Sequence, residues 1–373
     1  MTNPQPTIVI IGQNPVKLWG LSGERRIARI AEANGLRVVT EAGGARLLAN
    51  PAFAFDPSWL RHIARTPATM LTSGGVPVLA HVGSDAEAAA VAGAMAADSP
   101  LSLPDVTGLA AEAGVSLFNE QLRKREQPFV DRLRPANIAA LEKASYVGAY
   151  KGVTDLLTKY LWPQWAFWLT RIAAAFGLSP NMVTGIGFLF CVAAGIAFYE
   201  GHYWWGLASG LVSMVLDTVD GKLARCTITS SWWGNVFDHG IDLIHPPIWW
   251  WAWAMGLAAY GTPIGSFALW TALAVIMVAY VVQRLIEGAF IAAFGMHIHV
   301  WERADSQFRL ITARRNPNWL ILLAAMVAGR PDLGLLALAW WAGLSCLFHV
   351  VRLGQAYWVR ARGKPILSWL EGA

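Results

Sequence analysis

Four aspartates lie close together in an apolar part of the sequence: Asp217, Asp220, Asp238 and Asp242. The first pair is spaced i,i+3 and the second i,i+4, so each pair lies on one face of a helix. Two antiparallel helices joined by a short loop would bring these two faces together. The spacing therefore predicts a cluster of four carboxylates.

Such a cluster needs a positive partner. Placing a charged side chain in or near hydrocarbon costs several kcal/mol, so charged residues in such a segment are interpreted by default as functional. Oxygen ligands without a His–Cys cluster favour hard cations such as Mg²⁺ or Mn²⁺. Two such ions can bridge the oxygens of a diphosphate and stabilise the charge on a displaced phosphate. We therefore predict two divalent cations, Mg²⁺ or Mn²⁺, in one active site.

Small and basic residues near the aspartates suit a nucleotide that carries phosphates. Gly221, Ala224 and Gly234 leave room for a bulky nucleotide near the backbone. Arg225 can pair bidentately with a phosphate. A hydroxyl that attacks a metal-bound diphosphate needs a base, and a carboxylate can accept its proton.

The same residues resemble the signature of a known family. Residues 217–242 read D-x2-D-G-x2-A-R-x8-G-x3-D-x3-D, which is similar to the signature of the CDP-alcohol phosphatidyltransferase family at every defined position. The eight-residue gap at 226–233 matches as well. Residues 179–184, SPNMVT, also resemble the start of the family's first span. The resemblance covers about residues 150–360.

The resemblance implies an integral-membrane enzyme of phospholipid biosynthesis with six transmembrane helices and two divalent metals. Such enzymes transfer a substituted phosphate from a CDP-linked donor to an alcohol and release CMP. By position, the metal ligands would be Asp217, Asp220, Asp238 and Asp242. Asp242 would also be the catalytic base. The CDP site would be shaped by Gly221, Ala224, Arg225 and Gly234.

The donor and the class of protein stay open at this point. The donor is either CDP-diacylglycerol, with an inositol-type or glycerol-type acceptor, or a CDP-polar alcohol such as CDP-inositol. The competing class is a non-enzymatic transporter or scaffold with a cation-binding carboxylate cluster, although the G-x2-A-R spacing argues against an ion pathway. Buried ion pairs are a further alternative, but only Lys222 and Arg225 are close in sequence, too few to balance four aspartates.

Histidines and arginines near the cluster are candidates for binding the acceptor. His239 and His245 flank two of the aspartates; the alternative is that packing alone satisfies them. A polar connection further along the chain carries Arg303, Arg309, Arg314 and Arg315. A phosphorylated or anionic acceptor could dock there. The alternative is that these charges only mark the cytoplasmic side.

Long apolar segments must position these residues. Hydrophobic residues make up 55% of the 373 residues and charged residues 14%, whereas an ordinary soluble domain has about 25% charged residues. This composition excludes a disordered chain. Because a span needs roughly 20 mostly apolar residues, we expect an α-helical polytopic membrane domain over 181–360. Its six transmembrane helices are expected at about 181–199, 203–223, 233–257, 265–287, 318–330 with its flanks, and 333–355.

Basic residues predict the orientation and the partners. Arginines gather at 284–317 and after the sixth span, whereas the opposite loops contribute only Arg330. The positive-inside rule therefore places both termini, with a tail at 361–373, in the cytoplasm, for a multi-pass protein of the inner or plasma membrane. The partners expected are the lipid bilayer, a CDP-linked donor and an alcohol acceptor, with no nucleic acid. A homodimer is one assembly open to such a chain.

A basic, amphipathic segment at 146–180 precedes the spans. Its tryptophans and lysines predict a linker and a helix that lies in the membrane interface, and the alternative is a helix packed over the spans. Basic residues at 118–146 predict a solvated helical linker, and the alternative is a segment near an anionic leaflet or a phosphate group.

Residues 1–145 predict a soluble cytoplasmic α/β domain, because strands and helices alternate along it. Strands are expected at 7–11, 36–40, 68–72 and 76–81, and helices at 25–34, 59–65 and 86–97.

The start of this domain resembles a sugar-phosphate nucleotidyltransferase, on the residues IVIIG at 8–12 and KLWGLSGERR at 17–26. Bifunctional enzymes that make and use CDP-inositol carry a cytidylyltransferase domain before a CDP-alcohol transferase domain. The glycine-rich loop that holds nucleotide phosphates in that family is missing here, and Pro15 removes a backbone donor. The resemblance thus implies a degenerate, non-catalytic domain.

Overall fold

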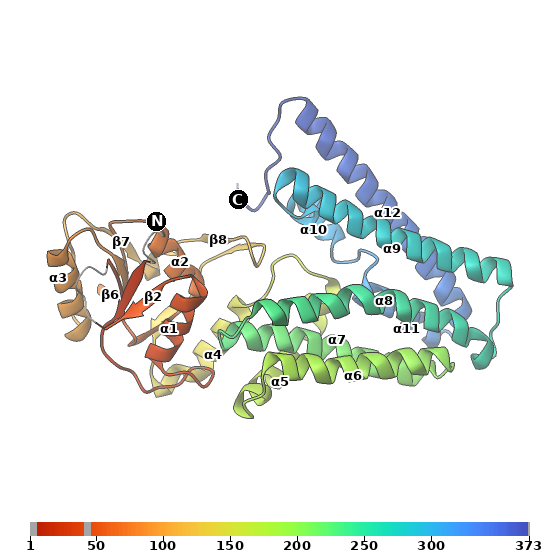
Figure 1. Ribbon diagram of the computed structural model, residues 1–373, viewed down its shortest axis with the longest axis horizontal. Coiled ribbons are helices and arrows are strands. Elements are labelled where there is room, and N and C mark those ends of the chain that lie inside the picture. Colours follow the sequence, from red (N-terminus) through yellow and green to blue (C-terminus); the bar gives the residue numbers. More distant parts are fainter. Residues whose placement is uncertain (1–5, 41–45, 372–373) are drawn as a thin grey trace. The chain divides into compact units, whose positions relative to one another are not determined.

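The computed structural model describes residues 6–40 and 46–371 (Figure 1). The chain divides into two compact units. The first comprises Met1–Tyr150, Thr170–Leu178 and Lys222–Ser230, and the second comprises Lys151–Leu169, Ser179–Gly221 and Ser231–Ala373. The expected order, an α/β region followed by a helical region, is confirmed.

A six-stranded mixed sheet forms the centre of the first unit. Its strand order is β2-β1-β3-β6-β5-β7, and β6 is antiparallel to both of its neighbours while the other adjacent pairs are parallel. The strands are β1 (Thr7–Ile10), β2 (Arg37–Val39), β3 (Leu47–Ala49), β5 (Thr69–Ser73), β6 (Val76–His81) and β7 (Thr107–Ala110). The helices are α1 (Gly23–Ala33), α2 (Pro57–Arg65), α3 (Asp85–Ala96) and α4 (Ile138–Gly148), with short 3-10 turns at η1 (Ala111–Ala113) and η2 (Pro135–Asn137).

Helices cover both faces of this sheet, because successive side chains of a strand point to opposite faces. In β3, Leu47 belongs to a core cluster that contains Ile27 of α1 and Trp59 of α2. The next residue, Leu48, belongs to a second cluster that contains Val91 of α3. The sheet is therefore the middle layer of three.

The elements expected in this region are confirmed, with small shifts at their ends. The strands are β1, β2, β5 and β6, and the helices are α1, α2 and α3. The turn between β5 and β6 contains Gly74 and Gly75, both with positive φ, which glycine adopts without steric cost.

The helical linker expected at 118–146 is wrong over its first half. This stretch forms a hairpin of β8 (Leu117–Asn119) and β9 (Lys124–Glu126), followed by β10 (Val130–Arg132), which pairs with β4 (Phe53–Phe55). The basic residues of this stretch favour a solvated helix in the sequence, so the hairpin is not predicted. The Lys124 ammonium, for example, lies 2.6 Å from the Glu126 carboxylate.

The second unit is helical. Its long helices are α6 (Pro180–Tyr199), α7 (Tyr203–Cys226), α8 (Trp232–Tyr260), α9 (Ser266–Phe294) and α12 (Pro331–Ala361). The shorter ones are η3 (Leu157–Leu161), α5 (Pro163–Ala175), η4 (Ile298–Val300), α10 (Arg303–Phe308) and α11 (Arg315–Val327). Helix α6 packs against α8, and α12 packs against both α9 and α11 (Figure 1). The last turns of α5 and α7 belong to the first unit.

Within residues 6–40 and 46–371, three helices, α6, α9 and α12, are long and apolar enough to cross a membrane. The expected spans 203–223 and 233–257 coincide with α7 and α8, and α11 has 13 residues. Six spans, and the side on which the termini lie, stay predictions.

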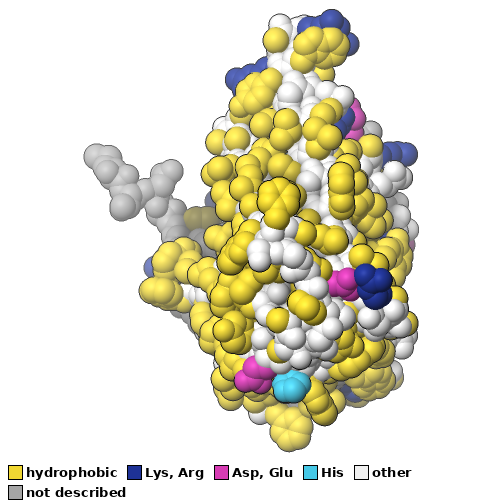
Figure 2. All heavy atoms as spheres, turned by 90° about the vertical axis from the view of Figure 1, so that its right-hand side faces the viewer, with side chains coloured by type: hydrophobic (Ala, Val, Ile, Leu, Met, Phe, Trp, Pro, Cys, Tyr) yellow, Lys and Arg dark blue, Asp and Glu magenta, His cyan; other side chains and the backbone are white. Residues whose placement is uncertain are grey.

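Large apolar side chains cover the outside of the helical unit. Leu189 of α6 is 68% exposed, and Phe267 of α9 and Trp340 of α12 are exposed more fully still. Figure 2 shows a face of the molecule on which hydrophobic side chains predominate and charged ones are few. On α5, Trp165 and Trp168 are exposed as well, as a helix in the membrane interface requires.

Candidate active site

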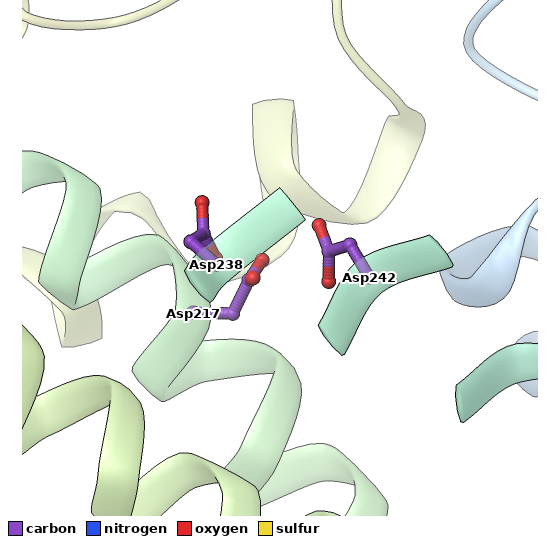
Figure 3. Close-up of side chains that lie close together, drawn as sticks. All are labelled: Asp217, Asp238 and Asp242. Carbon is purple, nitrogen blue, oxygen red and sulfur yellow. The ribbon is translucent and has the colours of Figure 1, made fainter. Parts of the chain in front are cut away.

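Three of the four aspartates converge between α7 and α8. Asp217 lies on α7, and Asp238 and Asp242 lie one turn apart on α8 (Figure 3). Carboxylate oxygens from all three lie within 4.8 Å of one another. The predicted i,i+4 pair therefore shares one face of α8 and meets a carboxylate of the predicted i,i+3 pair.

The start of α8 is fixed by a side-chain cap. The Ser231 hydroxyl accepts a hydrogen bond from the Gly234 N–H at 3.0 Å, which satisfies one of the free donors of the first turn. A Cβ at Gly234 would lie 3.0 Å from both this hydroxyl and the Asn181 amide oxygen. The motif glycine thus lets α8 begin close to residues of α6, one turn before Asp238.

The segment of α8 around Asp242 is shaped by two prolines. Pro246 and Pro247 lie inside the helix, and a proline cannot donate to the carbonyl four residues earlier. The Leu243 carbonyl, which Pro247 leaves without a helical donor, accepts a hydrogen bond from the Tyr280 hydroxyl of α9 at 2.8 Å. Helix α9 therefore holds the backbone next to Asp242.

Arg315, at the start of α11, bridges two of the three clustered aspartates. Its guanidinium donates to Asp217 and to Asp242, each at 2.6 Å. Its Nε donates to the Asn316 side chain at 3.1 Å, and Asn316 donates to Asp155 at 3.0 Å. The cation that balances the carboxylates thus comes from a residue far away in sequence.

Asp220 lies in a different environment from the other three. The Thr184 hydroxyl of α6 donates to one of its carboxylate oxygens at 2.5 Å. Its other oxygen is buried and has no hydrogen-bond partner among the described residues. A buried carboxylate oxygen of this kind calls for a donor or a cation.

The four aspartates fit a divalent metal. Their donor set consists of carboxylate oxygens alone, which Mg²⁺ and Mn²⁺ prefer. Three of them already lie close enough to share a cation, and Asp220 offers an oxygen without a partner.

The residues expected to shape the nucleotide site lie at the ends of α7 and α8. Gly221 follows Asp220 directly on α7, and Ala224 and Arg225 occupy the last turn of that helix, within the first unit. The Arg225 Nε donates to the Ala149 carbonyl at 2.9 Å.

The two candidate histidines differ in accessibility. His239 is exposed, and its Nδ1 lies 2.9 Å from the Asn235 carbonyl. His245 is buried against the Trp249 ring, and its Nδ1 lies 2.7 Å from the Ile241 carbonyl. Both rings thus contact the backbone of their own helix.

The candidate arginines separate into different surroundings. Arg314 pairs with Glu287 of α9, and its guanidinium lies 3.1 Å from the ring of the buried His299. Arg303 lies over the Trp369 ring, while Arg309 follows α10 directly. Arg315 contacts the carboxylate cluster directly, through Asp217 and Asp242.

Several residues that contact or orient the candidate site residues give little signal in the sequence. Thr184 stands out in the sequence only as part of the segment 179–184. Asp155 and Asn316, which orient Arg315, carried no signal of their own, although Asn316 adjoins a candidate residue. Glu287 of α9, which pairs with the candidate residue Arg314, lies in an expected span and gives no signal of its own.

Comparison with known proteins identifies the region that carries this geometry. The model of the CDP-alcohol phosphatidyltransferase family matches residues 177–328, which include all four aspartates. Residues 177–328 are thus similar to the CDP-alcohol phosphatidyltransferase family. The family, and the relatives with which this domain aligns, are transferases of substituted phosphate groups.

Curated relatives match a part of the chain. Choline/ethanolaminephosphotransferase 1 of Arabidopsis thaliana is 36% identical over 121 residues, which is 29% of this chain and 29% of that protein. Phosphatidylinositol phosphate synthase of Streptomyces avermitilis is 32% identical over 116 residues, which is 31% of this chain and 40% of that protein. The chain thus spans less than half the length of either relative.

A solved structure also resembles this chain. It is the crystal structure of phosphatidylinositol phosphate synthase of Mycobacterium tuberculosis with CDP-DAG bound, at 18% identity and a TM-score of 0.37. The match covers 50% of this chain and 91% of that one.

Proposed function

We propose that this protein transfers a substituted phosphate from a CDP-linked donor to an alcohol and releases CMP. The observation that carries the proposal is the convergence of Asp217, Asp238 and Asp242 from the two helices of the family motif. Carboxylates between apolar helices cost free energy, so their presence there indicates a function.

In the proposed reaction, Asp242 is the base. It accepts the proton of the acceptor hydroxyl, whose oxygen then bonds to the phosphorus of the substituted phosphate. The bond from this phosphorus to the oxygen of the CMP phosphate breaks, and CMP leaves. Asp242 suits this role because its side chain is partly exposed, whereas Asp220 is buried, so that an acceptor can reach it.

Asp217, Asp220, Asp238 and Asp242 would hold two Mg²⁺ or Mn²⁺ ions, which supply positive charge to the donor diphosphate and to the leaving CMP when bound. The protein residues do the remaining work. Gly221, Ala224 and Gly234 leave room for the nucleotide, and Arg225 pairs with its phosphate.

Arginine side chains supply positive charge for binding the acceptor. Arg315 donates to Asp217 and Asp242, so its guanidinium stands next to the proposed base. With Arg303, Arg309 and Arg314 it supports an anionic or phosphorylated acceptor, to which arginine can bind bidentately. His239 and His245 are further candidates. CDP-diacylglycerol and a CDP-polar alcohol such as CDP-inositol are both donors to test.

The N-terminal α/β domain is proposed to be a degenerate, non-catalytic nucleotidyltransferase-like domain. Side chains of this domain accept hydrogen bonds from two backbone N–H groups of the loop after β1. The Asn14 N–H donates to the Glu24 carboxylate at 2.5 Å, and the Val16 N–H donates to the Asn14 side chain at 3.1 Å. A carboxylate therefore stands where a phosphate-binding loop would offer free N–H groups.

The proposed setting is the lipid bilayer. Three apolar helices and the family support a membrane protein. Six spans, both termini in the cytoplasm and an inner or plasma membrane location extend this proposal. A homodimer is tested by the mass of the purified protein in detergent.

A screen of donors and acceptors tests the function. Purified full-length protein is incubated with Mn²⁺ or Mg²⁺, CDP-diacylglycerol or CDP-inositol, and a panel of free and phosphorylated alcohols. Mass spectrometry should detect CMP together with one new phosphodiester. Cation flux in liposomes, without CMP from any donor, would instead establish the transporter alternative.

A further inference from the structure

The end of α7 has an unusual cap. The Thr229 N–H donates to the Ala224 carbonyl at 2.8 Å, which is the six-to-one hydrogen bond of a Schellman motif. The residue that adopts the left-handed conformation in this motif is normally glycine. Here it is Ile228, with a φ of 53°, which is strained for a β-branched side chain.

The N-terminal unit holds this strained residue in place. The Ile228 side chain packs against the core cluster that contains Ile27 and Ile30 of α1. A strained backbone persists only where its surroundings determine it. The conformation of this cap therefore depends on the packing of the α/β region.

Two arginines of the same helix, α1, bind the carbonyls that α7 leaves free. Arg26, which is 3% exposed, donates to the Cys226 carbonyl at 3.1 Å. Arg29 donates to the Thr227 carbonyl at 2.9 Å. The last carbonyls of a helix lack partners within it, and a cation near them also interacts favourably with the helix dipole.

The end of α4 contacts the same turn from another side. Lys222 is 2% exposed and lies over the ring of Tyr150, which follows α4. The Arg225 Nε donates to the Ala149 carbonyl. Two motif residues, Ala224 and Arg225, thus lie on a turn that is held by α1, by α4 and by the strained cap.

We propose that the α/β region is a positioning module for the nucleotide end of α7, in which Arg26, Arg29 and Ile228 set the affinity for the CDP-linked donor. This inference rests on the proposed function. A fixed turn presents Ala224 and Arg225 in one arrangement, so less conformational freedom is lost when the nucleotide binds. The region thereby acts on catalysis without a reaction of its own.

Full-length protein in detergent tests the proposal with Arg29→Gln. Arg25→Gln is the matched control, because Arg25 is exposed on the same helix. Hydrogen exchange of residues 222–230, followed by mass spectrometry, should be faster in R29Q than in R25Q. The KM for the CDP-linked donor should rise about tenfold in R29Q, from the loss of one charged hydrogen bond, whereas the KM for the acceptor and kcat stay unchanged.

Two further variants keep the test decisive. Arg29→Lys keeps the charge and should recover part of the donor KM. Ile228→Ala keeps the left-handed backbone but loses the packing, and should speed exchange in the same peptide.

The outcomes separate the two proposals. Equal exchange and equal donor KM in R29Q and R25Q would overturn the positioning role, as would faster exchange with an unchanged donor KM; both leave the proposed function intact. A wild-type protein that releases no CMP from any donor would overturn the proposed function itself, whatever the exchange shows.

Discussion

The two units place charge and apolar surface in opposite ways. In the α/β unit, Trp59 and its neighbours fill the core, and ion pairs such as Arg46–Asp85 lie at the surface. In the helical unit, apolar side chains such as Leu189 cover the outside, and Asp217 and Asp242 meet Arg315 between helices.

This contrast indicates that the charged side chains have different roles in the two units. A surface ion pair is worth roughly 0–1 kcal/mol and is easily lost. Carboxylates gathered between the helices of an apolar unit lower its stability, so their presence indicates that they bind a ligand or take part in a reaction. Four predictions test the contrast, from the largest expected effect to the smallest.

Asp242→Asn should have the largest effect. The amide cannot accept the proton of the acceptor hydroxyl, so kcat should fall by about 10²- to 10⁴-fold. The measurement is the rate of CMP release at saturating Mn²⁺ and donor. Glu200→Gln, which removes an exposed carboxylate between α6 and α7, is the control and should keep the wild-type rate. Full turnover in D242N would show that another group is the base.

Leu189→Arg should prevent stable insertion of α6. Replacing a leucine by arginine near the middle of a span costs roughly 3–4 kcal/mol, so the variant should leave the membrane fraction. Val147→Arg, at a position that is 55% exposed on α4, should change stability by less than about 0.5 kcal/mol. Equal losses of membrane protein in both variants would contradict the contrast between the two surfaces.

Arg315→Gln should destabilise the metal-free protein. Loss of a cation that donates to two half-buried carboxylates costs about 1–3 kcal/mol, since Asp217 and Asp242 would then face each other without it. Thermal unfolding in a chelator should show a lower Tm, and Mn²⁺ should raise the Tm of R315Q by more than that of wild type. Arg330→Gln breaks a more exposed pair with Asp332 and should change the Tm little. A Tm for R315Q that Mn²⁺ leaves unchanged would argue against a cation site.

Ser84→Ala should have the smallest effect. The Ser84 hydroxyl accepts from the Glu87 N–H at 3.3 Å, and the Glu87 carboxylate accepts from the Gly83 and Ser84 N–H groups. Loss of such a cap costs about 1 kcal/mol, measured as a lower unfolding temperature of the α/β region. The exposed Ser102→Ala is the control.

The same cap predicts a dependence on pH. The N–H groups of Gly83 and then Ser84 lower the pKa of Glu87. The cap therefore contributes its full stability above the ordinary pKa of a glutamate and loses it as the pH falls through the lowered value. Glu87→Gln should remove this part of the acid dependence.

Local pattern predicted much of the fold. The β-branched run at β1 and the glycines between β5 and β6 carry strong signals of their own. The hairpin of β8 and β9 carries a weak signal, because Lys124 and Arg125 are also typical of a solvated helix. The next strand, β10, pairs with β4 far earlier in the chain, Val130 opposite Phe55, and local pattern does not predict such a pairing.

The residues of the candidate site also differ in how far local sequence pattern predicts them. The spacing of Asp238 and Asp242 predicted that they share a face of one helix, because helical period is local. Arg315 was predicted only as a residue for the acceptor, and no spacing could place it against Asp217, 98 residues earlier. Ile228 gave no signal at all, because a positive φ is a property of the fold.

The release of CMP from a CDP-linked donor tests the central claim most directly. Purified full-length protein is first treated with a chelator and then titrated with Mn²⁺, while CMP is followed over time with the donor and acceptor from the screen. CMP release should be absent in the chelator, should return with Mn²⁺, and should stay absent in Asp238→Ala. Release that persists in the chelator, or that D238A supports at the wild-type rate, would contradict an aspartate-bound metal site as the centre of the reaction.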